Sequence, residues 1–174
     1  SEGFATYFTA VYMEFNKSKD DFKKIMKKSR ERVIKYFEKK NHSSIVNLKI
    51  EKLRSILNTN TYQKGAWVLH MLRKKLGDDV FFNGIRSYYS KYRNLNASTV
   101  DFRNCMEIES GENLSGFFRQ WVYGPGIPVI KWKWKYNRKK RLIEMKLDQI
   151  QRTGVIFNIP LEIGIYKNGS SDPE

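Results

Sequence analysis

The sequence predicts an α+β protein in which a helical region precedes the start of an antiparallel β-sheet. Through residues 1–123, apolar side chains recur every three to four positions, which is the spacing of amphipathic helices. After Gly124-Pro125-Gly126 the spacing changes to two, as in half-buried strands. With 174 residues, 40% of them hydrophobic, the chain is long enough for one domain and part of another. This composition excludes a wholly disordered chain.

Three helices are expected in the first part of the chain. Apolar residues on one side predict a helix over residues 1–15. We expect Asp20 to cap a second helix that ends near residue 41, because a carboxylate accepts hydrogen bonds from free N–H groups in the first turn. The pattern over residues 45–57 is ambiguous and is compatible with a further short helix. Residues 61–77 predict a buried helix, because they are apolar nearly all round and end in a glycine.

Three more helices are expected before the change of period. Asp78 and Asp79 favour a helix start and precede an aromatic-rich segment. Ser98 and Asp101 have the spacing of a capping box, which predicts a fifth helix. A sixth is expected to begin near Asn113 and to end before Gly124, where the Gly-Pro-Gly segment stops the pattern.

The remaining residues predict three strands of a sheet that continues beyond residue 174. Trp132, Trp134 and Tyr136 alternate with lysines, and we expect these aromatic side chains to pack on a sheet face. Residues 137–140 predict a turn, and alternation resumes over 143–147 and again over 155–165. Asn168-Gly169 is typical of a hairpin turn, but no return strand follows it here.

The net charge of +15, from 33 Lys and Arg against 18 Asp and Glu, raises the possibility of a nucleic-acid or membrane-surface protein. Ten of these cations fall in residues 19–40, where they alternate with apolar residues at helical spacing. We interpret them as the solvated face of a helix. No zinc-finger, helix-turn-helix or RNA-recognition motif is present. No apolar run approaches the ~20 residues that span a bilayer.

Composition also limits the chemistry. The single cysteine, Cys105, excludes an internal disulfide and is expected to be a small buried apolar residue. His42 and His70 are the only histidines and do not form the H-E-x-x-H pair of zinc proteases. His70 lies in the apolar helix and is expected to be an interior histidine with a hydrogen-bond partner. No P-loop, G-x-S-x-G or dinucleotide motif is present.

Five segments, in order along the chain, resemble those of the aminopeptidase N family of zinc metallopeptidases (the gluzincin aminopeptidases). They are Glu2-Gly3-Phe4-Ala5 with Tyr7, Tyr62-Gln63-Lys64-Gly65-Ala66 followed by Val68-Leu69-His70-Met71-Leu72-Arg73, Gly77-Asp78-Asp79 with Phe81, Asn96-Ala97-Ser98-Thr99 with Asp101-Phe102, and Phe117-Phe118-Arg119-Gln120-Trp121 with Gly126 and Pro128. Because the order and spacing agree across most of the chain, the resemblance is specific.

The resemblance implies that Glu2 is the third zinc ligand and Tyr62 the catalytic tyrosine that stabilises the oxyanion. In the family, the other ligands are the two histidines of H-E-x-x-H, whose glutamate is the general base. These residues, and the Gly-x-Met-Glu-Asn segment that holds the substrate amine, are absent here. The structural alternatives are a first-turn acid at Glu2, favoured by the helix dipole, and an ordinary aromatic at Tyr62.

We therefore expect a C-terminal piece of a zinc aminopeptidase that acts on peptides. Residues 1–123 would form the helical lobe of a thermolysin-like catalytic domain, and 127–174 a truncated β-sandwich. The isolated chain is expected to be inactive and to lack zinc, because the N-terminal part of the same protein is missing. The alternative is a non-catalytic scaffold or basic nucleic-acid-binding module that keeps the fold; retention of Glu2 and Tyr62 argues against it.

Overall fold

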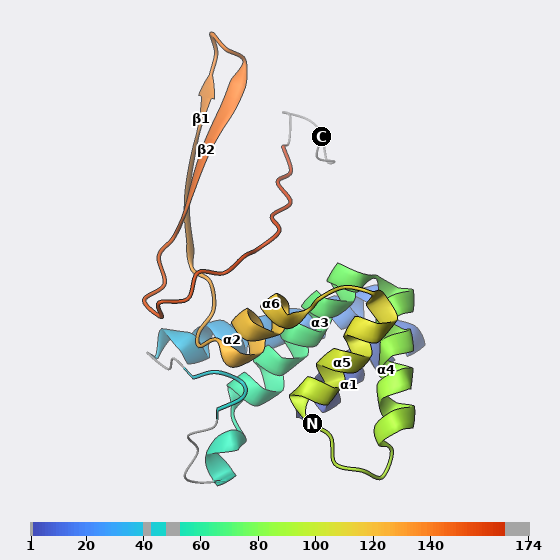
Figure 1. The fold of residues 1–174 in the computed structure, drawn as a ribbon. Helices are drawn as coiled ribbons and strands as arrows, with labels where there is room; N and C mark the ends of the chain where they lie inside the picture. The colour runs from blue at the N-terminus through green and yellow to red at the C-terminus, as the bar shows by residue number, and fades with distance from the viewer. Residues whose placement is uncertain (1, 40–42, 48–52, 166–174) are drawn as a thin grey trace.

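The computed structural model describes residues 2–39, 43–47 and 53–165 of the chain (Figure 1). His42 and the Asn168-Gly169 turn predicted from the sequence lie outside these residues. The helical elements are α1 (Glu2–Asn16), α2 (Lys19–Glu38), the 3₁₀-helix η1 (Leu53–Ile56), the π-helix η2 (Asn60–Lys64), α3 (Gly65–Leu76), α4 (Asp78–Tyr92), α5 (Thr99–Ser110), α6 (Ser115–Phe118) and the π-helix η3 (Arg119–Tyr123). The strands are β1 (Ile130–Asn137) and β2 (Leu142–Gln149).

The α+β class and the order of helices predicted from the sequence are confirmed. The capping box at Ser98 and Asp101 is present, with Asp101 N–H donating to Ser98 Oγ at 3.2 Å. Gly77 ends α3 with a φ of +81°, a conformation that favours glycine. The predicted cap at Asp20 is wrong. Ser18 has the extended backbone of a capping residue and accepts from Asp21 N–H at 3.1 Å, which places Asp20 in the first turn of α2.

Among the described residues, the helices enclose a hydrophobic core around α3. Its fully buried side chains include Tyr7, Leu72, Phe81 and Phe118, which come from four different helices. Cys105 is buried in α5, as expected. No helix among the described residues has the length and apolar character needed to cross a membrane.

A polar cluster joins three of these helices. The Arg73 side chain, only 6% exposed, forms ion pairs with Glu14 of α1 at 2.6 Å and with Asp78 of α4 at 2.7 Å. Because both carboxylates neutralise and hydrogen-bond the buried guanidinium, its burial is compensated. This cluster fixes the ends of α1 and α4 to α3.

Strands β1 and β2 form an antiparallel hairpin that projects away from the helices (Figure 1). Trp132 faces Leu147, Trp134 faces Met145 and Tyr136 faces Ile143 across the two strands, so one face of the hairpin is apolar. Trp132 and Trp134 are each 58% exposed. Both aromatic side chains therefore lie on a sheet face, as predicted, but within the part of the chain that the structure describes this face remains more than half exposed at the two tryptophans.

The third strand predicted over residues 155–165 is also wrong, since only two strands occur among the described residues. The backbone of this segment pairs with side-chain amides instead. Gln149 exchanges two hydrogen bonds with Phe157, at 2.6 and 2.9 Å, and Gln120 exchanges two with Asn158, both at 2.9 Å. The alternation arises because Phe157 is buried against Trp121 of η3, with ring centroids 4.9 Å apart.

Candidate functional site

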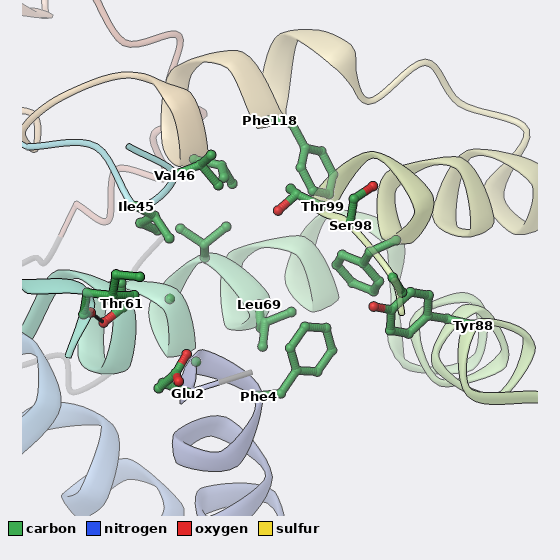
Figure 2. A pocket seen from close by; sticks show the side chains of 17 residues that line it. Glu2, Phe4, Ile45, Val46, Thr61, Leu69, Tyr88, Ser98, Thr99 and Phe118 are labelled. Atoms are coloured by element: carbon green, nitrogen blue, oxygen red, sulfur yellow. Dashed lines mark hydrogen bonds between the residues drawn. The ribbon is translucent and has the colours of Figure 1, made fainter. Parts of the chain in front are cut away.

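A cavity of about 260 Å³ lies at the N-terminal end of α1, between that helix, α3 and the start of α5. Figure 2 shows Glu2 and Thr61 at one end of it and Tyr88, Ser98 and Thr99 at the other. Apolar side chains form most of the surface between these ends. The lining includes Glu2, Phe4, Thr61, Leu69, Ser98 and Phe118.

Two glycines set the geometry at the Glu2 end. A Cβ atom built on Gly3 would lie 2.9 Å from the Cα atom of Gly65 and 3.2 Å from the carbonyl oxygen of Thr61. The first turn of α1 therefore lies directly against the turn that joins η2 to α3. Only residues without a side chain allow two backbones to approach so closely. As a result, Glu2 lies beside a segment that follows it by about sixty residues.

Tyr62 occupies the middle of that segment. It lies in the π-helix η2, is half-buried, and its backbone N–H donates to the carbonyl oxygen of Asn58 at 3.1 Å. π-Helical turns are rare and are frequent at functional sites. Its neighbour Thr61 lines the cavity, whereas Tyr62 is not one of the lining residues. The structure thus brings the turns that carry Glu2 and Tyr62 into contact, and Thr61, next to Tyr62, lines the cavity.

The far end of the cavity is polar. Ser98 caps α5 and donates from its hydroxyl to Asp101 at 2.7 Å. Burial and the nearby Asp101 carboxylate raise the pKa of Tyr88, so its phenol stays protonated at neutral pH. Thr61, Tyr88, Ser98 and Thr99 were not identified from the sequence as lining a site. Ser98 and Thr99 belong to a segment that resembles a family motif, and Ser98 also carried a capping signal, but neither signal predicts a cavity, because long-range packing assembles it.

His70 is an interior histidine, as predicted. Its Nδ1 atom and the Tyr7 hydroxyl are 3.2 Å apart and share a hydrogen bond, and its ring packs among Tyr7, Phe22 and Trp67. Burial lowers the pKa of His70 to about 4. The imidazole is therefore neutral at pH 7, and its ring is enclosed by aromatic side chains of the core.

The described residues supply one of the ligands that a zinc site needs. A carboxylate oxygen is an ordinary zinc ligand, and Glu2 supplies one at the end of the cavity. A catalytic zinc ion typically takes three protein ligands. Among the residues that the structure describes, no group of three or more His, Cys, Asp or Glu side chains comes together.

Comparison with known proteins agrees with this geometry. A family model described as the peptidase family M1 domain matches residues 1–121, more than two thirds of the chain. Aminopeptidase N from Lactococcus lactis subsp. lactis is 38% identical over 69 residues, which are 40% of this chain and 8% of that protein. The chain thus spans only a small part of the length of this relative.

Solved structures share the fold. Legionella pneumophila aminopeptidase A, solved with aspartic acid, superposes with a TM-score of 0.65 at 18% identity, over 87% of this chain and 17% of that one. An M1 zinc metallopeptidase from Deinococcus radiodurans superposes with a TM-score of 0.58 at 24% identity, over 74% of this chain and 28% of that one. The structural likeness to the first of these extends past the helices into the residues that follow them.

Proposed function

Because this chain belongs to the peptidase M1 family, we propose that it is part of a zinc-dependent aminopeptidase that removes N-terminal residues from peptides. Residues 1–123 form the helical lobe of its catalytic domain, and residues 127–174 begin a β-sandwich. One observation carries the proposal: the turns that bear Glu2 and Tyr62 are packed against each other at one end of a cavity.

Glu2 holds the metal in this proposal, as one of three protein ligands. The first turn of α1 presents its carboxylate at the cavity, and the contact of Gly3 with Gly65 fixes that turn. The two histidine ligands and the general-base glutamate come from outside residues 1–174. When bound, zinc polarises the scissile carbonyl and activates a water molecule.

Tyr62 stabilises the transition state. Its phenol donates a hydrogen bond to the oxyanion that develops as water adds to the scissile carbonyl. Such a donor costs no reorganisation when it is held in place beforehand, and removing one raises the barrier by about 3–4 kcal/mol. The position in η2 suits this role, because the backbone of the turn is held by hydrogen bonds while the side chain stays half-buried.

The test uses the full-length protein that carries this chain. In Tyr62→Phe, we expect kcat for an aminoacyl-anilide to fall about 10²–10³-fold while the zinc content stays that of the wild type. In Glu2→Gln, we expect the zinc content itself to fall, as measured by elemental analysis. Tyr12→Phe and Glu38→Gln change the same groups on exposed helix faces and serve as matched controls. Unchanged turnover in Tyr62→Phe would remove Tyr62 from the mechanism.

Assays of the isolated chain test whether residues 1–174 are only part of an enzyme, as proposed, or are active alone. We expect residues 1–174 alone to bind zinc weakly and to hydrolyse nothing, because one carboxylate does not hold a catalytic metal. Hydrolysis by the purified chain that disappears in its Tyr62→Phe variant would contradict this. Retention of a ligand-type residue and a phenol at adjoining turns favours a catalytic role over a scaffold.

A further inference from the structure

Lys64 is a buried cation in the same turn as Tyr62. Its residue is 2% exposed, and its Nζ atom lies 5.5 Å from the centre of the Phe37 ring. It donates a hydrogen bond of 3.4 Å to the carbonyl oxygen of Gly124. Among the described residues, no carboxylate forms an ion pair with it.

Packing alone does not account for a lysine at this position. An ammonium group taken out of water loses its hydration, and one long hydrogen bond and an aromatic face compensate only part of that loss. Burial accordingly lowers the pKa of Lys64 to about 8. A methionine of similar length would fill the same space without this penalty. A group that weakens the fold where it stands is a candidate for a functional role.

The hydrogen bond shows what the ammonium holds together. Gly124 directly follows η3 and ends the helical region, and a Cβ atom there would lie 2.5 Å from the carbonyl oxygen of Gln120. Gly124, whose carbonyl oxygen accepts the Lys64 hydrogen bond, therefore lies tightly against η3. Lys64 links this carbonyl to η2, across sixty residues of sequence.

The opposite side of η2 carries Tyr62. Side chains two positions apart in a helical turn project to roughly opposite sides. Lys64 is buried in the core, so Tyr62 faces away from it, on the half-exposed side of η2. Two further hydrogen bonds hold η2 and the start of α3 to α2. Trp67 Nε1 donates to the Met26 carbonyl oxygen at 3.2 Å, and Ser29 Oγ donates to the Gln63 carbonyl oxygen at 3.5 Å.

We propose that Lys64 is a positioning residue for Tyr62: by binding the Gly124 carbonyl, its side chain fixes the π-helical turn that presents the Tyr62 phenol to the substrate. The inference rests on the proposed role of Tyr62. It assigns to Lys64 no contact with the substrate. Its effect is on the placement of the phenol, so it changes kcat and leaves substrate affinity alone.

The test is a double-mutant cycle in the full-length protein. We expect Lys64→Met to lower kcat about 10- to 100-fold with KM within about twofold of wild type, and to unfold at the same or a higher temperature. In a Tyr62→Phe background, we expect Lys64→Met to change kcat by less than about twofold, because no phenol is left to position. Lys27→Met, on the exposed face of α2, is the control for loss of a positive charge.

Each other outcome overturns the inference in a recognisable way. Equal losses from Lys64→Met in both backgrounds, or no loss in either, would leave Tyr62 catalytic and Lys64 unconnected to it. A Lys64→Met protein that does not fold would show that the fold itself needs the ammonium group. Full activity in Tyr62→Phe would instead show that Tyr62 is not catalytic, and Lys64 would then have no catalytic side chain to position.

Discussion

The helical region and the segment after it bury their apolar side chains to very different extents. Among the described residues, every buried hydrophobic side chain belongs to residues 2–122 except Phe157. The hairpin has an equally regular apolar pattern, yet Trp132, Trp134 and Tyr136 remain more than half exposed. Each amphipathic helix here buries its apolar face against other helices of the same chain. A two-stranded hairpin has no second layer of its own, and such hairpins are marginal in water.

The largest difference between the two regions is expected on truncating aromatic side chains. Phe81 is fully buried against Tyr7 and Phe82, so Phe81→Ala should lower the free energy of unfolding by about 3–5 kcal/mol. Trp134→Ala on the hairpin should change it by less than about 0.5 kcal/mol. Denaturant titration of both variants measures this. Similar losses would mean that the hairpin is as tightly packed as the helices.

The second prediction concerns Lys64, which binds the carbonyl oxygen of Gly124, where the helical region ends. Its pKa is lowered to about 8, below the value of about 10.5 in the unfolded chain. Between these pH values the unfolded chain binds the proton and the folded one does not, so the stability of the wild type rises as the pH increases. We expect Lys64→Met to be more stable by about 1–3 kcal/mol at pH 7 and to lose this advantage towards pH 10. A pH-independent difference would contradict the buried charge.

The third prediction concerns acid stability of the helical core. The pKa of His70 is lowered to about 4, so only the unfolded chain gains this proton as the pH falls from about 6.5 to 4. The wild type should lose about 1–2 kcal/mol of stability in that window from this source. The hydrogen bonds from Arg73 lower the pKa of Asp78, so this carboxylate ionises below that window in every variant. His70→Phe should therefore show a smaller loss than wild type between pH 6.5 and 5.

The smallest effect is expected where the segment after β2 is held by side-chain amides. Gln149→Met removes both hydrogen bonds to Phe157 and should cost about 1 kcal/mol locally. Hydrogen exchange of the Phe157 amide should become several-fold faster, while amides in α3 exchange as before. Gln151→Met loses bonds to the Val129 N–H, to Gln149 Oε1 and to the Val155 carbonyl oxygen, and should disturb the Phe157 amide less because both Gln149 bonds to Phe157 remain. Unchanged exchange at Phe157 would mean that its contact with Trp121 suffices.

Local signals account for the parts of the fold that the sequence predicted correctly. The Ser98 capping box and the glycine end of α3 depend only on neighbouring residues. Where two capping residues stand close together, as Ser18 and Asp20 do, pattern alone does not choose between them. The third strand was wrong because alternation indicates only that one side of a segment is buried. The glutamine amides that replace a neighbouring strand are side-chain partners, at sequence separations of 8 residues for Gln149 and 38 for Gln120, and no strand pattern encodes them.

The candidate site shows the same division. Glu2 and Tyr62 were found by resemblance to family motifs, and their catalytic roles remain proposals. The cavity between them and Ser98 arises from contacts of α1, α3 and α5, which no local pattern encodes. Lys64 carried one usable signal, since it is a charged residue at the start of a nearly continuous apolar run. Its partner Gly124 could be found only from the folded chain.

The glycine contact between α1 and α3 also determines how much sequence change this end of the protein tolerates. An alanine at position 3 would place its methyl carbon 2.9 Å from the Gly65 backbone, and ordinary separations begin near 3.4 Å. The two helices would have to move apart by several tenths of an ångström. Metal–ligand distances are reproducible to about 0.2 Å. A single methyl group at position 3 would thus displace Glu2 by more than the distances in its proposed zinc site allow, even in a protein that still folds.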